Sequence, residues 1–484
     1  MNPRSISCLA VAMTLLVTAE VHARSYILVA EELALPVNLE TSVLAAGGTV
    51  TLFLPQIGVA VVESDRDEFA PAAGAIIGIG SVLPDVTVQG AEPFYEASEA
   101  VADGELVADA VSLVITDPRF PIQWGLAAIN APGAWAAGHF GAGVRVAVLD
   151  SGIASSHIDL AASVNNVLSR SFVPGEAYNY TYAGPGTTTF NHGTHVAGII
   201  ASRMNNAGGV GVAPQAEIVA VKVVRTKTGS GSLSWVMAGI VYAADIEADV
   251  INMSLGALFP RRGYLVDVNH TPGNPADDIK IGADQVSEMV TALGRATNYA
   301  HQRGTTIIAS AGNSALDRDH DADMWATPAD IPHVIAVAAT APFGWAKNPA
   351  GTFLDNPAHY SNYGQSRIDF AAPGGDSLYT PKDEFSTIGT ATAKTYVFDM
   401  VYSPSNRYLA ADGKTYTVWS WASGTSMAAP HVSGVAALII GKNGGRMAPA
   451  AVEAALRASA DDLGKPGKDD FYGHGRVNAA RAVQ

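Results

Sequence analysis

The chain has 484 residues, 48% of them hydrophobic, with a formal net charge of −16 and an isoelectric point of about 5.1. This length is enough for a large buried core and for more than one domain. The acidic balance argues against binding to nucleic acid or to anionic membranes, because phosphate groups would repel the chain.

The N-terminal segment predicts a signal peptide over residues 1–23. Arg4 precedes an apolar run over residues 6–17, and Val21-His22-Ala23 is a small-residue cleavage site. The run is too short to anchor the protein in a membrane, and no later apolar stretch is long enough. The only cysteine, Cys8, would leave with this segment. We therefore expect a secreted protein, extracellular or periplasmic, without disulfides and without membrane contact after cleavage.

The next stretch predicts a small α+β unit. Apolar strand patterns over residues 26–30, 50–54 and 57–62 accompany a helical pattern over residues 37–46. An acidic, alanine-rich stretch over residues 96–110 follows, and we interpret it as an exposed linker.

The rest of the chain alternates apolar strands with helical stretches. Strands are predicted over residues 218–224, 250–254 and 305–310, and helices over residues 232–247 and 286–303. This repeated βαβ pattern predicts an α/β fold with a mostly parallel, doubly wound sheet, whose functional site lies at the carboxyl ends of the strands.

Three polar residues stand where such a fold places its chemistry. Asp150 ends an apolar run over residues 144–149, His192 lies in the first turn of a predicted helix over residues 191–200, and Ser426 follows a glycine at another helix start. A serine hydroxyl is a weak nucleophile that needs a base within hydrogen-bond reach, itself oriented by a third group. The backbone amides of a helix N-terminus can also stabilise an oxyanion. We therefore predict a catalytic triad of these three residues.

The three segments resemble the Asp, His and Ser motifs of the subtilisin-like serine peptidases, the subtilases, and they occur in the order typical of that family. The resemblance runs from about Gln123 to nearly the last residue. It implies that Asp150 orients the base, that His192 is the base and that Ser426 is the nucleophile. Asn313 ends a further matching segment, which implies that its side-chain amide binds the oxyanion.

The resemblance also implies a substrate-binding cleft. Gly229-Ser230-Gly231 resembles the edge that pairs with the substrate backbone, and Ser254-Leu255-Gly256 resembles the segment that lines the primary specificity pocket. Both imply an extended peptide bound as an added strand. Thr327-Pro328 matches a family segment with a cis proline. Ala326 would lie at the pocket floor and favour small or medium apolar side chains.

The place of the N-terminal unit implies a precursor. In subtilases, a unit placed like residues 24–95 is a propeptide that assists folding and occupies the active site. We therefore expect a signal peptide at 1–23, a propeptide and linker at 24–115 and a subtilisin-like peptidase domain at 116–484, with self-cleavage between about Asp103 and Asp117. The predicted protein is a secreted serine endopeptidase. It would hydrolyse polypeptide substrates through an acyl-enzyme intermediate, with its own propeptide as a transient inhibitor.

No cofactor and no catalytic metal are required for this chemistry, although subtilases often bind structural calcium. Asp317, Asp319, Asp321 and Asp323 form an alternating acidic loop with oxygen ligands suited to calcium. The loop lacks the glycine and the closing glutamate of an EF-hand, so a solvated acidic loop is the alternative.

Two segments depart from the family pattern. Extra sequence at residues 259–284 and 377–418 is rich in Gly, Pro, Asp and Thr. We interpret both segments as surface loops that shape access to the cleft.

A different nucleophile architecture is one alternative. Gly424-x-Ser426-x-Ala428 is one residue away from the nucleophile elbow of α/β-hydrolases. That fold needs its acid and histidine after the serine, here Asp461 or Asp469 with His474, and it would give the upstream aspartate and histidine no role.

A catalytically silent secreted binding protein on a protease scaffold is the other alternative. The presence of all four chemical residues argues against it. His195 and His431 are interpreted as structural, because the base needs a single imidazole.

Overall fold

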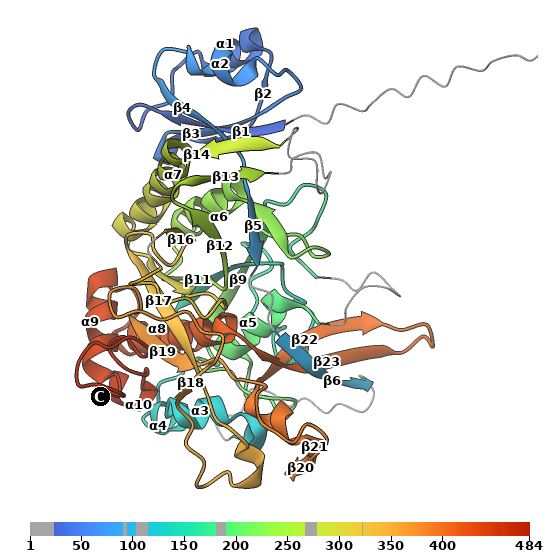
Figure 1. Cartoon of the computed structure of the whole chain (residues 1–484). Helices are drawn as coiled ribbons and strands as arrows, with labels where there is room; N and C mark the ends of the chain where they lie inside the picture. The colour runs from blue at the N-terminus through green and yellow to red at the C-terminus, as the bar shows by residue number, and fades with distance from the viewer. Residues whose placement is uncertain (1–23, 91–93, 103–114, 181–189, 267–277, 322) are drawn as a thin grey trace, which may run out of the picture.

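A computed structural model describes residues 24–90, 94–102, 115–180, 190–266, 278–321 and 323–484 (Figure 1). The expected signal peptide, residues 1–23, lies outside these ranges. Within them, no helix combines the length and the apolar character that a membrane span requires.

The centre of the molecule is an eight-stranded sheet in the order β18-β17-β15-β11-β7-β9-β8, with β19 paired to β17 outside that path. All neighbours are parallel except β17 and β18, so the expected α/β fold with a mostly parallel sheet is confirmed. The strands are β7 (Arg145–Asp150), β8 (Arg170–Ser171), β9 (Glu217–Lys222), β11 (Val250–Met253), β15 (Thr306–Ser310), β17 (Val334–Ala341), β18 (Asn356–Pro357) and β19 (Phe370–Pro373).

Both faces of this sheet are covered, because alternate residues of each strand point to opposite sides. In β7, Val146 and Val148 pack in the core that includes α5 and α8, whereas Ala147 and Leu149 pack in the core that includes α6 and α7. Burying each larger aliphatic side chain stabilises the fold by roughly 1.5–3 kcal/mol. The covering helices are α5 (His192–Ala201), α8 (Thr425–Lys442), α6 (Leu233–Asp245) and α7 (Ala283–Gln302), with α3 (Trp124–Ala128), α4 (Ala131–Ala136), α9 (Pro449–Ser459) and α10 (Ala479–Ala482) around them.

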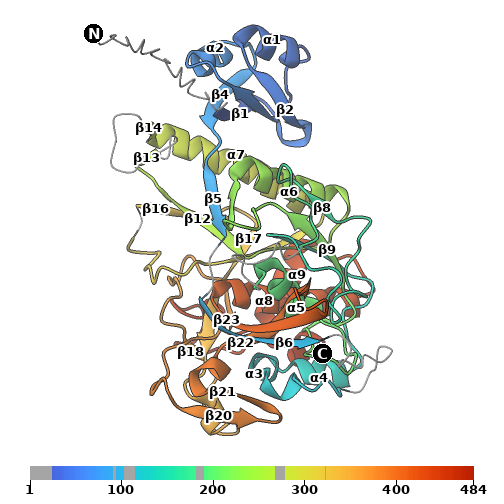
Figure 2. The ribbon, with the colours of Figure 1, turned by 90° about the vertical axis from the view of Figure 1, so that its right-hand side faces the viewer.

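The N-terminal unit forms a separate antiparallel sheet in the order β2-β3-β1-β4. Figures 1 and 2 show it stacked against α7. Arg295 of α7 donates from Nη1 to the Ala30 carbonyl at 3.0 Å, and Gln56 donates to Asp245 of α6 at 2.9 Å. The unit contains β1 (Arg24–Ala30), α1 (Leu39–Ala46), β2 (Thr49–Leu54), β3 (Val59–Ser64), α2 (Phe69–Gly74) and β4 (Ile79–Pro84), so the sequence analysis missed its second helix and fourth strand.

The chain then runs over the large domain as two further strands. β5 (Thr87–Gly90) lies between β10 (Ser230–Ser232) and β12 (Leu255–Pro260), and β16 (Met324–Thr327) flanks β12. β6 (Phe94–Ala102) pairs with β23. The linker expectation is therefore wrong for residues 96–102, because pairing with β23 makes this acidic segment a strand. The remainder of that expected linker begins at residue 103 and lies outside the described ranges.

The two extra segments are more ordered than the sequence analysis expected. The first contains the hairpin of β13 (Gly263–Val266) and β14 (Ile279–Gly282). The second contains β20 (Phe385–Ile388), β21 (Ala391–Lys394) and the long hairpin of β22 (Val401–Leu409) and β23 (Thr415–Ser423). Polar residues such as Ser403 and Asn406 are buried in β22, so their composition concealed a packed strand.

Candidate active site

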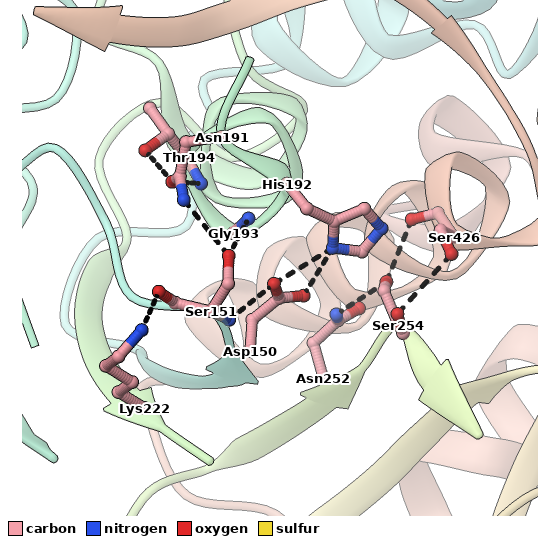
Figure 3. A network of polar contacts seen from close by, with 10 residues as sticks. All are labelled: Asp150, Ser151, Asn191, His192, Gly193, Thr194, Lys222, Asn252, Ser254 and Ser426. Atoms are coloured by element: carbon pink, nitrogen blue, oxygen red, sulfur yellow. Dashed lines mark hydrogen bonds and ion pairs between the residues drawn. The ribbon is translucent and has the colours of Figure 1, made fainter. Parts of the chain in front are cut away.

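Asp150 and His192 form a close pair. Asp150 is the last residue of β7 and is buried, and His192 is the first residue of α5. The Nδ1 atom of His192 lies 2.9 Å from each carboxylate oxygen of Asp150 (Figure 3). Asn191 caps α5 by accepting from Thr194 N at 2.8 Å, and it donates from Nδ2 to Ser151 Oγ at 3.0 Å. The cap therefore ties the start of the histidine helix to the end of the aspartate strand.

Ser426 completes the predicted group of three. It lies buried in the first turn of α8, and its hydroxyl donates to the Ser254 carbonyl at 3.4 Å. Figure 3 shows the His192 ring between Asp150 and Ser426. The Nε2 atom of His192 is buried and has no hydrogen-bond partner within the described ranges. A histidine nitrogen is thus available to take a proton on the side of the serine.

Asn313 is oriented by the residue before the serine. Its Oδ1 accepts from the backbone nitrogen of Thr425 at 2.9 Å and from the Thr425 hydroxyl at 2.7 Å. Because the oxygen is bound on that side, the amide nitrogen is the group left for the cleft. Asn313 also lines two cavities, of about 540 and 370 Å³.

A glycine and a lysine support this arrangement, and the sequence analysis named neither. A Cβ on Gly193 would lie 2.3 Å from the Gly152 carbonyl and 3.0 Å from Asp150 Oδ1, so only glycine fits there. Lys222 stands beside Asp150 in the paired strands, and its buried Nζ donates to Thr226 at 2.8 Å and to the Ser151 carbonyl. Both residues make their contacts with segments distant in the sequence. Only the close spacing of glycines near the motifs could have indicated the role of Gly193, and no sequence signal indicated that of Lys222.

The two other histidines near the site hold the backbone. Burial lowers the pKa of His195 to about 3 and that of His431 to about 4. His195 Nε2 lies 3.0 Å from the Ser420 carbonyl, and His431 Nδ1 lies 2.8 Å from the Met427 carbonyl. Both are neutral near pH 7, in agreement with the structural roles expected for them.

The acids and histidine of the α/β-hydrolase alternative are engaged elsewhere. Asp461 pairs with Arg476 and with Arg481, the latter at 3.0 Å. Asp469 accepts from the backbone nitrogen of Phe471 at 2.9 Å, and the His474 ring packs near Phe370. None of the three contacts Ser426 in any described hydrogen bond or ion pair.

The expected substrate edges are occupied by the chain's own β5. In β10, Ser230 stands opposite Gln89 and Gly231 opposite Val88; in β12, Leu255 stands opposite Gly90 and Gly256 opposite Gln89. Gly229 precedes β10 in a left-handed conformation with φ 63°, and Ser254 precedes β12 in contact with Ser426. An extended peptide therefore fits between these two edges as an added strand.

The larger cavity adjoins this strand. Gly256, Asn313 and Ala326 line it, and the peptide bond before Pro328 is cis, as the resemblance implied. The cavity also reaches Tyr264 of the β13–β14 hairpin. Burial raises the pKa of Tyr264 to about 12, and its hydroxyl has no hydrogen-bond partner within the described ranges. The sequence analysis did not place this residue at the pocket, because its neighbours come from distant segments.

The acidic loop proposed for calcium does not converge on one point. Asp317 pairs with His320 at 2.8 Å, Asp321 accepts from Asp317 N at 3.1 Å, and Asp323 pairs with Arg262 at 3.1 Å. Among the residues that the structure describes, no group of three or more His, Cys, Asp or Glu side chains is arranged to hold a metal ion. The solvated-loop alternative fits these contacts.

Three features define the class of protein: the parallel sheet, the Asp-His pair at its carboxyl edge and the serine at a helix start. They are the features of a serine hydrolase with an α/β fold. The chain belongs to the subtilase family, whose model matches residues 141–475. It is 34% identical over 372 residues to thermitase from Thermoactinomyces vulgaris, covering 76% of this chain and 98% of the relative. It is 33% identical over 364 residues to subtilisin DY from Bacillus licheniformis, covering 75% and 99%. The chain is therefore a serine endopeptidase, and polypeptides are its substrate class.

Solved structures share the fold over nearly the whole chain. The epidermin leader peptide processing serine protease from Staphylococcus aureus superposes with a TM-score of 0.68 at 21% identity, covering 95% of this chain and 98% of that one. Fervidolysin from Fervidobacterium pennivorans has a TM-score of 0.63 at 24% identity, covering 95% and 61%. These matches extend over the N-terminal unit as well as the large domain.

Proposed function

We propose that the protein is a secreted serine endopeptidase that acts through Asp150, His192 and Ser426. The observation that carries the proposal is the placement of the His192 ring between the Asp150 carboxylate and Ser426 (Figure 3). The proposal of secretion rests on the signal-peptide pattern of residues 1–23.

Each residue has a defined part in the reaction. His192 Nε2 takes the proton of Ser426 as the serine oxygen attacks the peptide carbonyl, and Asp150 holds the positive imidazolium. The amide of Asn313 and the backbone nitrogen of Ser426 bind the oxyanion. His192 then gives its proton to the leaving amine, which departs and leaves an acyl-enzyme. His192 then takes a proton from water as the water attacks this ester, and it returns that proton to the Ser426 oxygen as the acid product leaves.

Labelling with a serine-directed fluorophosphonate tests this function. We expect the mature protein to label and to hydrolyse peptides, the matched control Ser287→Ala at an exposed serine of α7 to do both, and Ser426→Ala to do neither. His192→Ala should lower kcat by at least about 10⁴-fold. Labelling that persists in Ser426→Ala would show that another residue is the nucleophile. No labelling and no hydrolysis by the unmodified protein would favour the silent binding protein.

We propose further that the precursor cuts itself between residues 90 and 94. Gly90 stands opposite Leu255, and Ser254, the next residue along that edge, contacts Ser426. β6 begins at Phe94, which stands opposite Ser423, three residues before the serine. We therefore place the first cut at one of the bonds between these two strands, before the 103–117 range expected from sequence. Residues 24–90 would remain bound as the transient inhibitor.

N-terminal sequencing after refolding tests the maturation proposal. We expect the full-length chain to yield a new N-terminus at one of residues 91–94, and the Ser426→Ala chain to stay intact. If the Ser426→Ala chain, free of other proteases, also lost its N-terminal unit, processing would not be its own. A first cut found only at residues 103–117 would contradict the placement while leaving self-processing possible.

We also propose a structural calcium site at Asp117 and Asp159 instead of the acidic loop. Both carboxyls are buried, and Asp117 Oδ2 and Asp159 Oδ1 have no hydrogen-bond partner within the described ranges. Burial raises the pKa of each, and for Asp159 the nearby Asp117 raises it further. A divalent cation bound by oxygen ligands would remove this cost.

Thermal unfolding of the Ser426→Ala chain with calcium and with a chelator tests the calcium site. We expect calcium to raise Tm in that chain and in the further variant Asp321→Asn, and to have a much smaller effect in Asp159→Asn. An equal rise in Tm in Asp321→Asn and in Asp159→Asn would show that calcium binds at another site.

A further inference from the structure

This inference rests on the proposed function and concerns where substrates bind on the leaving-group side. The chain crosses the large domain as two strands, β5 and β6, which lie apart from each other in Figure 2. β5 pairs with β10 and β12 on the acyl side, and β6 pairs with β23 on the other. β23 ends at Ser423, three residues before the serine.

We propose that the outer edge of β23, residues Thr415–Ser423, binds the leaving-group half of polypeptide substrates as an added antiparallel strand. We call this surface the leaving-group edge. β5 and β6 of the chain itself are paired as the two halves of a bound substrate would be. A substrate from another molecule would take the same path once β6 has left.

The backbone of the leaving-group edge supplies the affinity. β6 matches β23 over eight register pairs, from Phe94 opposite Ser423 to Ala102 opposite Tyr416. Without β6, the outward N–H and C=O groups of β23 would have no strand partner, and an extended peptide restores those bonds whatever its sequence. A folded substrate segment would not fit, so the edge selects extended chains.

Arg119 adds a preference for a carboxylate on that strand. Its Nε donates to Glu99 Oε2 at 2.8 Å, and its Nη2 pairs with Glu99 Oε1. Tyr402 OH donates to Glu99 Oε2 at 3.4 Å, and Nη1 of Arg119 is held by Thr390 Oγ1 at 2.6 Å. The Arg119 side chain is 18% exposed. A two-pronged, partly buried arginine already held in place is suited to bind one carboxylate at a fixed distance along the strand.

Release of β6 requires a second cut. The first cut, between residues 90 and 94, frees its N-terminal end. A later cut in the 103–117 range that the sequence analysis proposed would free its C-terminal end. β6 is then a bound product that leaves the edge open.

A series of quenched fluorescent peptides tests the proposal on mature enzyme whose loss of residues 94–102 is verified by mass. All peptides share the residues before the cut and carry 2, 5, 8 or 11 residues after it. We expect kcat/KM to rise by about tenfold with length and then to level off, since a few added strand bonds contribute about 1.4 kcal/mol or more. Equal kcat/KM for 2 and 11 residues would overturn the leaving-group edge.

A second series tests Arg119 through a ratio. Long peptides carry Glu or Gln at one of the sixth to ninth positions after the cut, which brackets the place of Glu99. We expect one position at which Glu is preferred by about threefold to tenfold. That preference should fall to about one in Arg119→Gln, persist in part in Arg119→Lys, and remain whole in Arg457→Gln, whose arginine pairs with Glu453 of α9.

The outcomes separate the two proposals. A preference for Glu that survives in Arg119→Gln would remove Arg119 from the edge. Failure to cleave even the shortest peptide would overturn the proposed endopeptidase mechanism, and the leaving-group edge with it. Cleavage of short and long peptides at one rate would overturn the edge alone.

Discussion

Asn313 reaches the cleft because the next helix fixes its oxygen. Thr425 binds that oxygen with both its backbone nitrogen and its hydroxyl, so the amide cannot turn away without breaking two hydrogen bonds. The proposed oxyanion donor and the residue that orients it are 112 positions apart. Motif matching predicted the first of the two and gave no sign of the second.

Replacing Asn313 by alanine should lower kcat with little change in KM. Removing one oxyanion donor costs about 10²- to 10³-fold in kcat, a magnitude measured on a subtilisin. Steady-state kinetics on a short peptide measures the effect, with Asn362→Ala as a comparison because Asn362 lines the same cavity and supports the same loop through Ser314 and Ala311. A drop below tenfold for Asn313→Ala would mean that backbone amides bind the oxyanion without it.

The residues that sequence predicted are those whose roles depend on chemical type and order. Asp150, His192, Ser426 and Asn313 stand in motifs long enough to be aligned without a structure. Lys222 could not be placed, because a lysine in an apolar strand has meaning only when its strand neighbour is known.

At the scale of elements, Asp399 joins a short helical turn in the second extra segment to another turn that precedes this segment in the sequence. It ends η5 (Thr395–Asp399) and accepts from the backbone nitrogens of Gly344 and Trp345, at 2.7 and 2.8 Å, at the start of η4 (Trp345–Lys347). Burial raises the pKa of Asp399 to about 7, with a smaller contribution from nearby Asp376, against the opposing effects of the two backbone hydrogen bonds and of Lys382. Burial outweighs these hydrogen bonds, so the folded state holds a proton at Asp399 at pH values where the unfolded chain has lost it.

Stability should therefore fall as the pH rises from about 4 to about 7. In that range the folded state binds a proton at Asp399 that the unfolded state has lost, so the free energy of unfolding decreases with pH and levels off above 7. The decrease from this group is at most about 4 kcal/mol, at about 1.4 kcal/mol per pH unit. Urea unfolding of the Ser426→Ala chain measures it.

Asp399→Asn should flatten that slope, and Asp383→Asn, at an exposed neighbour, should leave it unchanged. If both variants kept the slope, other groups would govern this part of the pH profile.

The sequence predicted helices and strands where the apolar periodicity is strong. It missed strands that form only because they pair with a distant segment. The strands of the parallel sheet are continuous apolar runs and could be recognised directly. β6 is acidic and alanine-rich, and β22 carries buried serines and asparagine, so neither has the alternation typical of a strand. Their partner in both cases is β23, which no local pattern in the sequence reveals.

For the whole molecule, the N-terminal unit is held in two ways. It contributes Ile27 and Leu54 from its sheet, and Ile57 from the turn between β2 and β3, to the same apolar core as α6 and α7. Arg295 adds a polar clamp, donating to the carbonyls of Ala30 at 3.0 Å and Glu32 at 3.4 Å. The apolar core provides most of the affinity, and the arginine fixes the docking angle.

Arg295→Ala should shorten the lag between self-cleavage and full activity. Loss of the clamp weakens binding of the cut unit by about tenfold, so it dissociates sooner. The lag is measured by following cleavage on gels and activity with a short peptide in the same sample. Arg303→Ala, at the far end of α7, is the control and should keep the original lag. Unchanged lag in Arg295→Ala would leave the apolar core as the only determinant of release.

The order of domains was predictable from sequence, whereas the path between them was not. The α+β pattern and its position before the family motifs indicated a separate unit. Its route through the cleft depends on which edges of the large domain are open, and those edges are formed by segments more than a hundred residues downstream.

β5 and β6 belong to the same chain as the edges they pair with, so under the proposed self-cleavage the first bond to be cut and Ser426 are parts of one molecule. Such a reaction is governed by effective concentration and not by the amount of protein in solution. The first cut of each precursor would then proceed at the same rate in a dilute culture fluid as in a crowded compartment. Only the later reactions, the second cut that releases β6 and the cleavage of foreign chains, would depend on the protein concentration.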